Sequence, residues 1–350
     1  MADGEQTGTD DSASPSDGPV TIYDVARAAG VASSTVSRAF SRPGRVNAET
    51  AARIHRIADE LGYRRNPLAG ALPTGRSGML ALVVTDVTNP VYAPIIRGAG
   101  LAATEDGYTL LLHDTQEDPD TERGALERTV PVVEGIVMAS SRLSDAALRT
   151  VASRRPTVVL NRGVGGVSSI YGDSARGMRR VAEHLGELGH GSITYLAGPE
   201  TSWADGMRWQ ALQAAGMDLD IKVRRVGPNA PTVAAGSAAV GSMTDDLPTA
   251  IAAYNDLLAI GAMRALAQQR VPVPDQVSVV GFDNIFGADF GTPALTTIAA
   301  PLHAMGKVAV ELLLDRLGGA DHPTDEPVVL PIRLVVRNST APCRPSHRRR

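Results

Sequence analysis

At 350 residues the chain is longer than one compact domain usually is, and 43% of its residues are apolar, so it predicts two or three units with a sizeable core. No apolar stretch approaches the roughly 20 residues that cross a bilayer, and the acidic, polar start lacks the pattern of a secretion signal. The single cysteine, Cys343, excludes a disulfide framework and a cysteine cage for a metal. We therefore expect a cytoplasmic protein with no membrane partner, no metal site and no cofactor.

The net charge of −4 is distributed unevenly along the chain. Residues 1–19 contain five acidic side chains and no basic ones, and their polar composition predicts a disordered tail. Residues 20–76 contain nine arginines against four acidic side chains, and residues 344–350 contain four more arginines. Basic segments attract polyanions, because each neutralised phosphate releases counterions. Charge alone is compatible both with nucleic-acid binding and with an ordinary solvated surface.

Residues 20–65 predict a small all-α domain of three short helices. The first carries apolar side chains at helical spacing and ends at Gly30, the second begins near Ser33, and the third is capped by Asn47. Two short helices joined by a tight turn that contains glycine form a helix-turn-helix, whose second helix enters the major groove of DNA. A small helical bundle that packs against another part of the chain is the alternative.

The second of these helices has a composition suited to reading a groove. Val36 and Phe40 are its expected inward-facing residues, while serine, threonine and Arg38 occupy its other faces. Hydroxyl groups bond to either kind of base edge, and an arginine can donate two hydrogen bonds to guanine, for roughly 1–3 kcal/mol of discrimination. The pattern favours direct reading of base pairs by this helix.

The remainder of the chain predicts a linker and an α/β core. A stretch rich in proline and glycine is typical of a linker, and after it strand-like runs alternate with helix-like runs. This alternation predicts parallel sheets covered by helices on both faces, and the strands are too many for one small sheet, so we expect two lobes. The expected boundaries are a hinge or linker at 66–77, lobe 1 at about 78–172 and 300–325, lobe 2 at about 173–299 and 326–338, and a disordered basic tail at 339–350.

The segment TIYDVARAAGVASSTVSRAFSRPGRVNAETAARIHRIADELGYRRNPLAGAL closely resembles the headpiece of the LacI/GalR family of bacterial transcriptional repressors. The shared pattern is T-I-x-D-V-A-x-x-A-G-V-x-x-x-T-V-S-R, followed later by L-G-Y-x-x-N. The resemblance continues to about residue 338 through NPVYAPIIRG, AEHLGELGHGSITYLAGP, YNDLLAIGAMRAL and VPDQVSVVGFDN. It implies a helix-turn-helix headpiece with a hinge helix, followed by a two-lobed core like that of periplasmic binding proteins.

The resemblance also implies a function. A homodimer would bind a palindromic operator, and a small effector between the two lobes would control the affinity for that DNA. The chain ends in NSTAPCRPSHRRR, which has no leucine heptad of the kind that makes tetramers, so a dimer is expected. In the family the hinge helix inserts a leucine, here Leu72, into the minor groove, where an apolar wedge unstacks a base step and kinks the duplex.

The candidate DNA-binding residues combine the groove-facing positions with the positions that match the family. Where the family usually has a serine that caps the second helix, this chain has Ala32, a loss of about 1 kcal/mol unless Ser33 takes over as the cap and shifts the start. The candidates are Thr21, Tyr23, Ser33, Ser34, Thr35, Ser37, Arg38, Asn47, Tyr63, Asn66, Ala69 and Leu72.

Most of the candidate effector-binding residues follow predicted strands, whereas Trp203 and Arg208 lie early in the helix after YLAGP. Open α/β sheets bind ligands beyond the carboxyl ends of their strands, and several polar or aromatic residues lie at such points. The resemblance implies that Arg208, Asn255 and Asp283 hold polar groups of the effector. Charged side chains suit vicinal hydroxyls, and an indole can cover the C–H face of a sugar, so a sugar is favoured. The candidates are Asn89, Tyr92, Asn161, Trp203, Arg208, Asn255 and Asp283.

Each of these residues also has a purely structural interpretation. Asp283 could cap a turn, Arg208 could form an ion pair between the lobes, and Trp203 and Tyr92 could pack in the core. Asp173 is better interpreted as a helix cap than as a ligand. The histidines at 113, 184 and 190 share no metal-ligand spacing, so structural roles are expected for them.

Other functions leave traces that this sequence lacks. A dinucleotide-binding enzyme needs G-x-G-x-x-G between a strand and a helix, and the glycines of NRGVGGVSS do not fit that spacing. No phosphate-binding Walker loop, G-x-S-x-G elbow or H-E-x-x-H occurs, so we expect no enzyme. The remaining alternatives are a regulator that responds to a purine, a nucleoside or a protein co-regulator, and a cytoplasmic sugar-binding protein.

Overall fold

The computed structural model describes residues 20–41, 44–64, 77–243, 247–319 and 326–343. The chain divides into two compact units, Met1–Arg76 and Ser77–Arg350, which we call the headpiece and the core. Three sets of predictions lie outside the described residues: the acidic tail at 1–19, the hinge positions Asn66, Ala69 and Leu72, and the end of the basic tail from 344.

The headpiece consists of the three expected helices, α1 (Ile22–Ala29), α2 (Ser33–Ser41) and α3 (Ala48–Glu60). Thr21 and Asp24 form a capping box at the start of α1, and Gly30 ends that helix in the left-handed region at φ 62°. The helices bury a compact apolar cluster that includes Val25, Val36 and Ile54. The helices depend on this cluster, because helices this short are marginal in isolation.

The first lobe of the core contains a six-stranded sheet in which every described pair of neighbours is parallel. Its strand order is β11 (Val328–Leu330), β5 (Ser168–Gly172), β4 (Thr157–Leu160), β3 (Gly135–Ala139), β1 (Met79–Val84) and β2 (Thr109–Asp114). The strands β1 and β3 are almost continuously apolar. Such runs are expected where both faces of a parallel sheet are covered.

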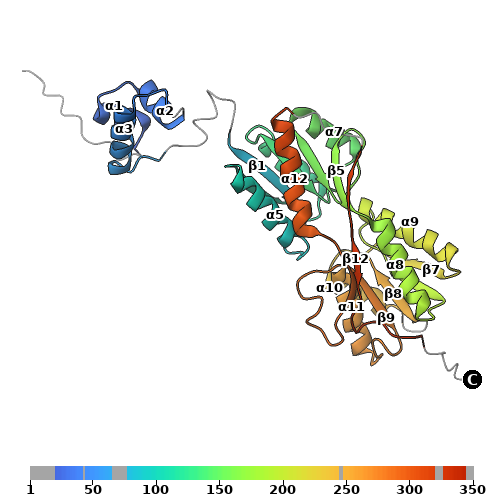
Figure 1. Ribbon diagram of the computed structural model, residues 1–350. Coiled ribbons are helices and arrows are strands. Elements are labelled where there is room, and N and C mark those ends of the chain that lie inside the picture. The colour runs from blue at the N-terminus through green and yellow to red at the C-terminus, as the bar shows by residue number, and fades with distance from the viewer. Residues whose placement is uncertain (1–19, 42–43, 65–76, 244–246, 320–325, 344–350) are drawn as a thin grey trace, which may run out of the picture. The chain divides into compact units, whose positions relative to one another are not determined.

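Alternate side chains of the central strands enter two different cores. In β1, Leu80 and Leu82 belong to one buried cluster, and Ala81 and Val83 belong to another on the opposite face. Helices supply the other side of each cluster, as Figure 1 shows for α5 and α12 on one face. The helices of this lobe are α5 (Tyr92–Glu105), α6 (Pro119–Thr129), α7 (Asp145–Arg154) and α12 (Leu302–Leu317).

The second lobe repeats the arrangement with one difference. Its sheet has the order β12 (Arg333–Val335), β10 (Thr296–Ala299), β9 (Ser278–Asp283), β8 (Ala250–Ala253), β6 (Ser192–Leu196) and β7 (Lys222–Val226). All neighbours are parallel except β12, which pairs antiparallel with β10. Its helices are α8 (Ser174–Glu187), α9 (Trp203–Asp218), α10 (Val233–Gly241) and α11 (Asp256–Gln268). Among the described helices, none combines the length and the apolar character that crossing a membrane would need.

The chain passes between the two lobes three times. It crosses between β5 and α8, between β10 and α12, and between β11 and β12. The expected division at 325/326 is therefore corrected: residues 328–330 form the edge strand β11 of the first sheet, and the crossing falls between Leu330 and Arg333. This segment forms two short strands, because each sheet takes one of them as an edge.

The predicted start of the disordered tail at 339 is also corrected. Ser339 is fully buried, where its hydroxyl donates to the Val279 carbonyl at 2.6 Å and accepts from the Thr296 amide. The Cys343 amide donates to the Leu188 carbonyl at 2.7 Å. Polar composition suggested a tail here, but these hydrogen bonds add residues 339–343 to the second lobe.

Candidate DNA-reading surface and effector cavity

Helix α2 separates its side chains into two faces as the sequence predicts. Val36 and Ala39 are buried in the headpiece cluster, whereas Ser34, Ser37 and Arg38 are exposed. The helix begins directly after Ala32, whose carbonyl accepts from the Val36 amide at 3.2 Å. Ser33 therefore does not take over as a shifted cap, and the exposed face keeps the register expected for a recognition helix.

The other predicted DNA-binding residues of the headpiece differ in what they already do. Tyr23 is 68% exposed. The hydroxyl of Thr21 donates to Asp24 at 2.6 Å, and Asn47 caps α3 by accepting from the Glu49 amide at 2.9 Å. Tyr63 is half-buried with its ring 5.9 Å from that of Phe40. Thr21, Asn47 and Tyr63 thus help to hold the headpiece together, which leaves Tyr23 as the freely accessible aromatic side chain among these candidates.

A polar cavity lies between the two lobes of the core, beyond the carboxyl ends of strands from both sheets. Six of the seven predicted effector residues line it: Asn89, Tyr92, Asn161, Arg208, Asn255 and Asp283. Its volume is about 20 Å³, which is room for little more than one water molecule. A larger ligand therefore requires the lobes to move apart or the lining side chains to turn.

Arg208 forms the centre of the cavity wall on lobe 2. It extends from α9, donates to the Tyr254 carbonyl, and lies 3.4 Å from a carboxylate oxygen of Asp283. Its guanidinium carbon is 3.5 Å from the centre of the Phe282 ring, a cation–π arrangement. Its Nε is buried without a hydrogen-bond partner, and an unmade bond of this kind costs about 1–3 kcal/mol. A ligand oxygen that accepts from this nitrogen would recover that energy.

Two carboxyl groups at or behind this wall have altered acidity. Burial raises the pKa of Asp283 to about 6, although the nearby Arg208 opposes the shift. Burial, together with the charge of Asp283, raises the pKa of Asp256 to about 8. Asp256 accepts from the Thr297 hydroxyl at 2.5 Å and from the Ile285 amide at 2.8 Å, so it ties α11 to β10 and to the segment after β9. Asp283 faces the cavity, while Asp256 supports it from below.

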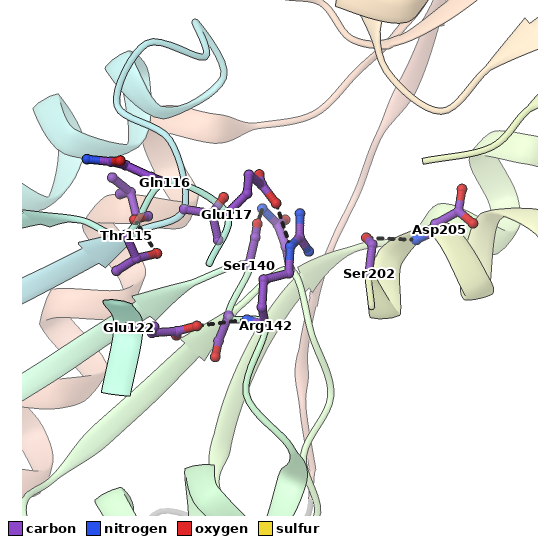
Figure 2. Close-up of polar contacts among 12 residues, drawn as sticks. Thr115, Gln116, Glu117, Glu122, Ser140, Arg142, Ser202 and Asp205 are labelled. Atoms are coloured by element: carbon purple, nitrogen blue, oxygen red, sulfur yellow. Dashed lines mark hydrogen bonds and ion pairs between the residues drawn. The ribbon is translucent and has the colours of Figure 1, made fainter. Parts of the chain in front are cut away.

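Lobe 1 contributes an ion pair that the sequence did not reveal. The Nε of Arg142 donates to Glu117 at 2.6 Å, and both side chains line the cavity (Figure 2). Ser140 and Tyr254 are further lining residues that were not predicted. The sequence does contain an indication of this pair, because Glu117 follows β2 and Arg142 follows β3 within three residues of each strand end. It was weak, since charged residues after strands are common on any protein surface.

Four residues of the cavity wall adopt backbone conformations that side chains other than glycine rarely take. Glu117, Ser140 and Asn161 have φ near +60°, and Asp283 has φ 109°. Each lies at the end of a strand or within three residues after it, and each lines the cavity. Residues held in such conformations cost of order 1–3 kcal/mol and are typical of ligand-binding sites. The strain turns these side chains toward the space between the lobes.

The remaining lobe 1 candidates are anchored to their neighbours. The Tyr92 hydroxyl is 2.6 Å from that of Thr85, and burial raises the pKa of Tyr92 well above its usual value. The Asn161 amide donates to the Ser140 hydroxyl at 3.1 Å. Asn89 accepts from the Val91 amide at 3.2 Å. These bonds orient the side chains without using all of their polar atoms, so each retains capacity for a ligand.

Trp203 is the predicted effector residue that the structure places elsewhere. Its ring packs 5.0 Å from that of Tyr171 and is absent from the wall of the cavity. It is the first residue of α9, whose helical turn directs Arg208 rather than Trp203 into the cavity. The indole cover for a sugar face stays a prediction, and in this arrangement of the lobes Tyr92 and Tyr254 are the aromatic residues of the wall.

Asp173 and the histidines have structural roles, as the sequence indicated. Asp173 caps α8 by accepting from the Arg176 amide at 2.9 Å. His190 bonds to Thr249 and Ser278, and His184 bonds to Thr340 at 2.9 Å. His113 bonds to Thr129 at 2.7 Å. Within the described residues, no group of three or more histidine, cysteine or acidic side chains is arranged to hold a metal.

Comparison with known proteins matches both units. A family model described as "Bacterial regulatory proteins, lacI family" matches residues 21–66, and one described as "Periplasmic binding protein-like domain" matches residues 182–340. The HTH-type transcriptional regulator DegA of Bacillus subtilis is 33% identical over 92% of this chain and 98% of its own length.

Solved structures agree with this match. The lac repressor dimer bound to operator and the anti-inducer ONPF has a TM-score of 0.82 and 27% identity, covering 93% of this chain and all of that one. The transcriptional regulator CelR in complex with cellobiose has a TM-score of 0.68 and 28% identity, covering 91% of this chain and 99% of that one.

Proposed function

Because this chain belongs to the LacI family of bacterial transcriptional regulators, we propose that it binds a palindromic operator as a homodimer and represses transcription under the control of a small effector. The family consists of DNA-binding regulators rather than enzymes. A regulator of this kind acts on the chromosome, so we place it in the cytoplasm. The observation that carries the proposal is a polar cavity built by both lobes of the same chain that bears an exposed recognition helix.

The proposed reading surface is the exposed face of α2. Ser34, Ser37 and Arg38 point away from the buried cluster and offer hydroxyl and guanidinium groups to base edges in the major groove. Tyr23, exposed at the start of α1, is placed to contact the backbone or a neighbouring base. Leu72, with Asn66 and Ala69, is proposed to act in the minor groove on the strength of the family resemblance.

The proposed effector is a sugar. The cavity wall offers arginine donors, carboxylate acceptors and asparagine amides, which together match the paired donor and acceptor character of sugar hydroxyls. Tyr92 and Tyr254 supply aromatic surface in the same wall. The solved relative with cellobiose shows that a protein of this fold takes a sugar.

An apolar groove on lobe 2 supports the dimer. Its volume is about 710 Å³, and its walls come from α11 and from the segments that precede β9 and β10, with Ile260, Met263 and Phe290 among the apolar side chains. Phe286 and Phe290 are 82% and 70% exposed, which is unusual for large aromatic residues of a monomer. A second copy of the chain is the proposed partner, because the related lac repressor is a dimer on its operator.

The proposed control of operator binding depends on movement of the lobes about the three crossings between them. An effector that prefers one separation of the lobes shifts the population of that state, and the two headpieces of a dimer must meet half-sites about one helical turn apart. A coupling of about 1–3 kcal/mol would change operator affinity roughly 5- to 150-fold. The cavity in its present form is nearly filled by its own side chains, and a separation of the lobes that admits the effector would link binding to the spacing of the headpieces.

The test has two arms that use the full-length protein. Selection from a random duplex library at moderate salt should enrich an inverted repeat that binds far more tightly than shuffled sequence. Adding sugars to the selected duplex in a gel-shift titration should then change the affinity by at least fivefold for one of them. Equal binding to every fragment, with and without sugars, would contradict the proposal.

A further inference from the structure

An arginine–carboxylate pair on lobe 1 faces the effector cavity. Arg142 and Glu117 are joined at 2.6 Å, with side chains that are 4% and 24% exposed, and both line the cavity. Only the Nε of Arg142 donates in this bond, and the two outer nitrogens of the guanidinium take no part in it. Neither residue was expected at this position from the sequence.

The pair is held in place by buried bonds of its own backbone. The amide of Arg142 donates to Glu122 at 2.9 Å, and Glu122 is itself 1% exposed (Figure 2). The amide of Glu117 donates to the Thr85 carbonyl at 2.6 Å. Glu117 itself, and Ser140 two residues before Arg142, have left-handed backbone conformations. A pair that is fixed in advance loses little freedom when a ligand arrives, which is a property of binding sites rather than of surface ion pairs.

A second pair of the same type lies on lobe 2. Arg208 and Asp283 line the same cavity with side chains that are 8% and 10% exposed, and the Nε of Arg208 is buried without a partner. The cavity therefore has one arginine–carboxylate pair on each lobe, and the two positive charges are balanced by two negative ones. Each pair presents donors and an acceptor at once.

We propose that Arg142 and Glu117 are specificity-determining residues that read hydroxyl groups of the effector from lobe 1, opposite Arg208 and Asp283. The effector then carries hydroxyls on two opposite edges and no acidic group, which excludes sugar phosphates and sugar acids. A hydroxyl donates to the carboxylate and accepts from the guanidinium, so it satisfies both members of a pair. An anionic group would lie beside Glu117 and Asp283, and each arginine is already neutralised. This inference rests on the proposed small-molecule control.

The experiment measures binding of matched ligands to the full-length protein by calorimetry. The ligands are neutral sugars, the uronic acid and phosphate of each, and a set of nucleosides and free purine bases. The wild type should bind a neutral sugar at least tenfold more tightly than its acidic derivatives. Glu117→Gln should weaken the neutral sugar about tenfold and strengthen the acidic derivatives, because Arg142 loses its counter-charge. Arg142→Met should weaken the neutral sugar about 10- to 100-fold.

A matched control uses an ion pair outside the cavity. Arg123 and Asp120 are joined at 2.5 Å on α6 of the same lobe, but their side chains are 57% and 83% exposed. Arg123→Met should leave the binding of every ligand unchanged. A merely structural role for Glu117 would lower the binding of neutral and acidic ligands alike, whereas a reading role changes their ratio.

Three outcomes would overturn the inference: tighter binding of a sugar acid or phosphate by the wild type, an unchanged ratio in Glu117→Gln, or selective binding of a purine base. If an acidic sugar binds and also changes operator affinity, the proposed function as an effector-controlled regulator is supported, and only the inference about Arg142 and Glu117 fails. If no ligand of the panel binds, this inference and the small-molecule part of the proposed function fail together. Operator selection, measured separately, then still decides the DNA-binding part.

Discussion

The headpiece and the core position their candidate functional residues by opposite means. In the headpiece the candidates lie on the outside of α2, and the inside of the same helix joins a cluster of seven buried apolar residues. In the core most of the candidates are themselves buried, and they come from segments that are far apart in the sequence, such as the strand ends near Arg142 and Asp283 and the helix that carries Arg208. An outward-facing surface on one helix follows from local periodicity, whereas an internal site depends on which strands become neighbours.

The largest expected effect comes from shortening one buried side chain in each unit. It tests whether the headpiece unfolds where the core stays folded. Ile54→Ala in α3 removes a fully buried side chain and should cost about 2–5 kcal/mol. A unit this small has only a few kcal/mol of stability, at about 0.05–0.15 kcal/mol per residue, so the headpiece should unfold. Proteolysis should then remove the headpiece and abolish DNA binding, while the core keeps its thermal transition and its ligand binding.

The matched change in the core is Leu148→Ala in α7, which is equally buried. It should cost a similar free energy, but the larger core should stay folded and lose only several degrees of its melting temperature. If Ile54→Ala leaves operator binding intact at 25 °C, the contrast in robustness between the two units is wrong.

The next largest effect concerns the outward face of α2. Arg38→Ala should reduce discrimination between operator and shuffled duplex by about 1–3 kcal/mol, or roughly 5- to 150-fold, with the fold of the headpiece unchanged. Gel shifts on both duplexes provide the measurement. Arg123→Ala on α6 removes the same charge outside the headpiece and should not alter discrimination. Undiminished discrimination in Arg38→Ala would remove this residue from the reading role.

A smaller effect should appear only in the core, where the carboxyl groups are buried. The pKa of Asp256 is raised to about 8 in the folded protein, so the folded state retains a proton that the unfolded chain releases near pH 4. The stability of the core should therefore fall as pH rises, by on the order of 1 kcal/mol between pH 7 and 8. Burial lowers the pKa of His184 and His190, which adds stability as pH rises toward 6.5 and has no further effect above it.

Thermal unfolding at pH 7 and 8 measures this slope. Asp256→Asn should flatten it, while Asp289→Asn, on the segment after β9, should leave it as in the wild type. A slope that survives in Asp256→Asn would assign the pH dependence to another group.

The smallest expected effect concerns the stability of the headpiece, through the N-terminal cap of α2. Ala32 is the residue directly before α2 and lacks a side-chain acceptor for the first free amides of the helix. Ala32→Ser should raise the stability of the headpiece by about 0.5–1 kcal/mol, seen as a higher midpoint of its own unfolding transition. Ala28→Ser, exposed within α1, should bring no gain. Equal stabilisation by both serines would argue against a capping effect.

The order of elements could largely be predicted from the sequence. The three headpiece helices, the end of α1 at Gly30 and the cap of α3 at Asn47 follow from spacing and from residue types with specific backbone preferences. The strands β1, β3, β4 and β9 could be predicted from continuous apolar runs, which are typical of parallel strands that helices cover on both faces. The short strands β5 and β10 were not predicted, because runs such as SSIYG and TTIA look polar until neighbouring strands cover them.

The site could be predicted where strand ends carry distinctive residues or where the family pattern extends into the core. Arg208, Asn255 and Asp283 were found through the family pattern, and Asn89, Tyr92 and Asn161 through their position after strands. The pair Arg142–Glu117 was not found, because its members are separated along the chain by α6 and β3, and no periodicity links them. Trp203 does not line the cavity because it is the first residue of α9 and packs on Tyr171, whereas Arg208 lies five residues further along the same helix.

The sequence by itself determined what depends on neighbours along the chain: the helices, their caps, the buried strands and the two faces of α2. Only the tertiary structure decided which charged residues meet, that β11 and β12 join different sheets, and that residues 339–343 pack on lobe 2. The physical reason is that pairing between distant segments depends on strand order and on the energy of burying charge. Those quantities exist only once the sheets have formed.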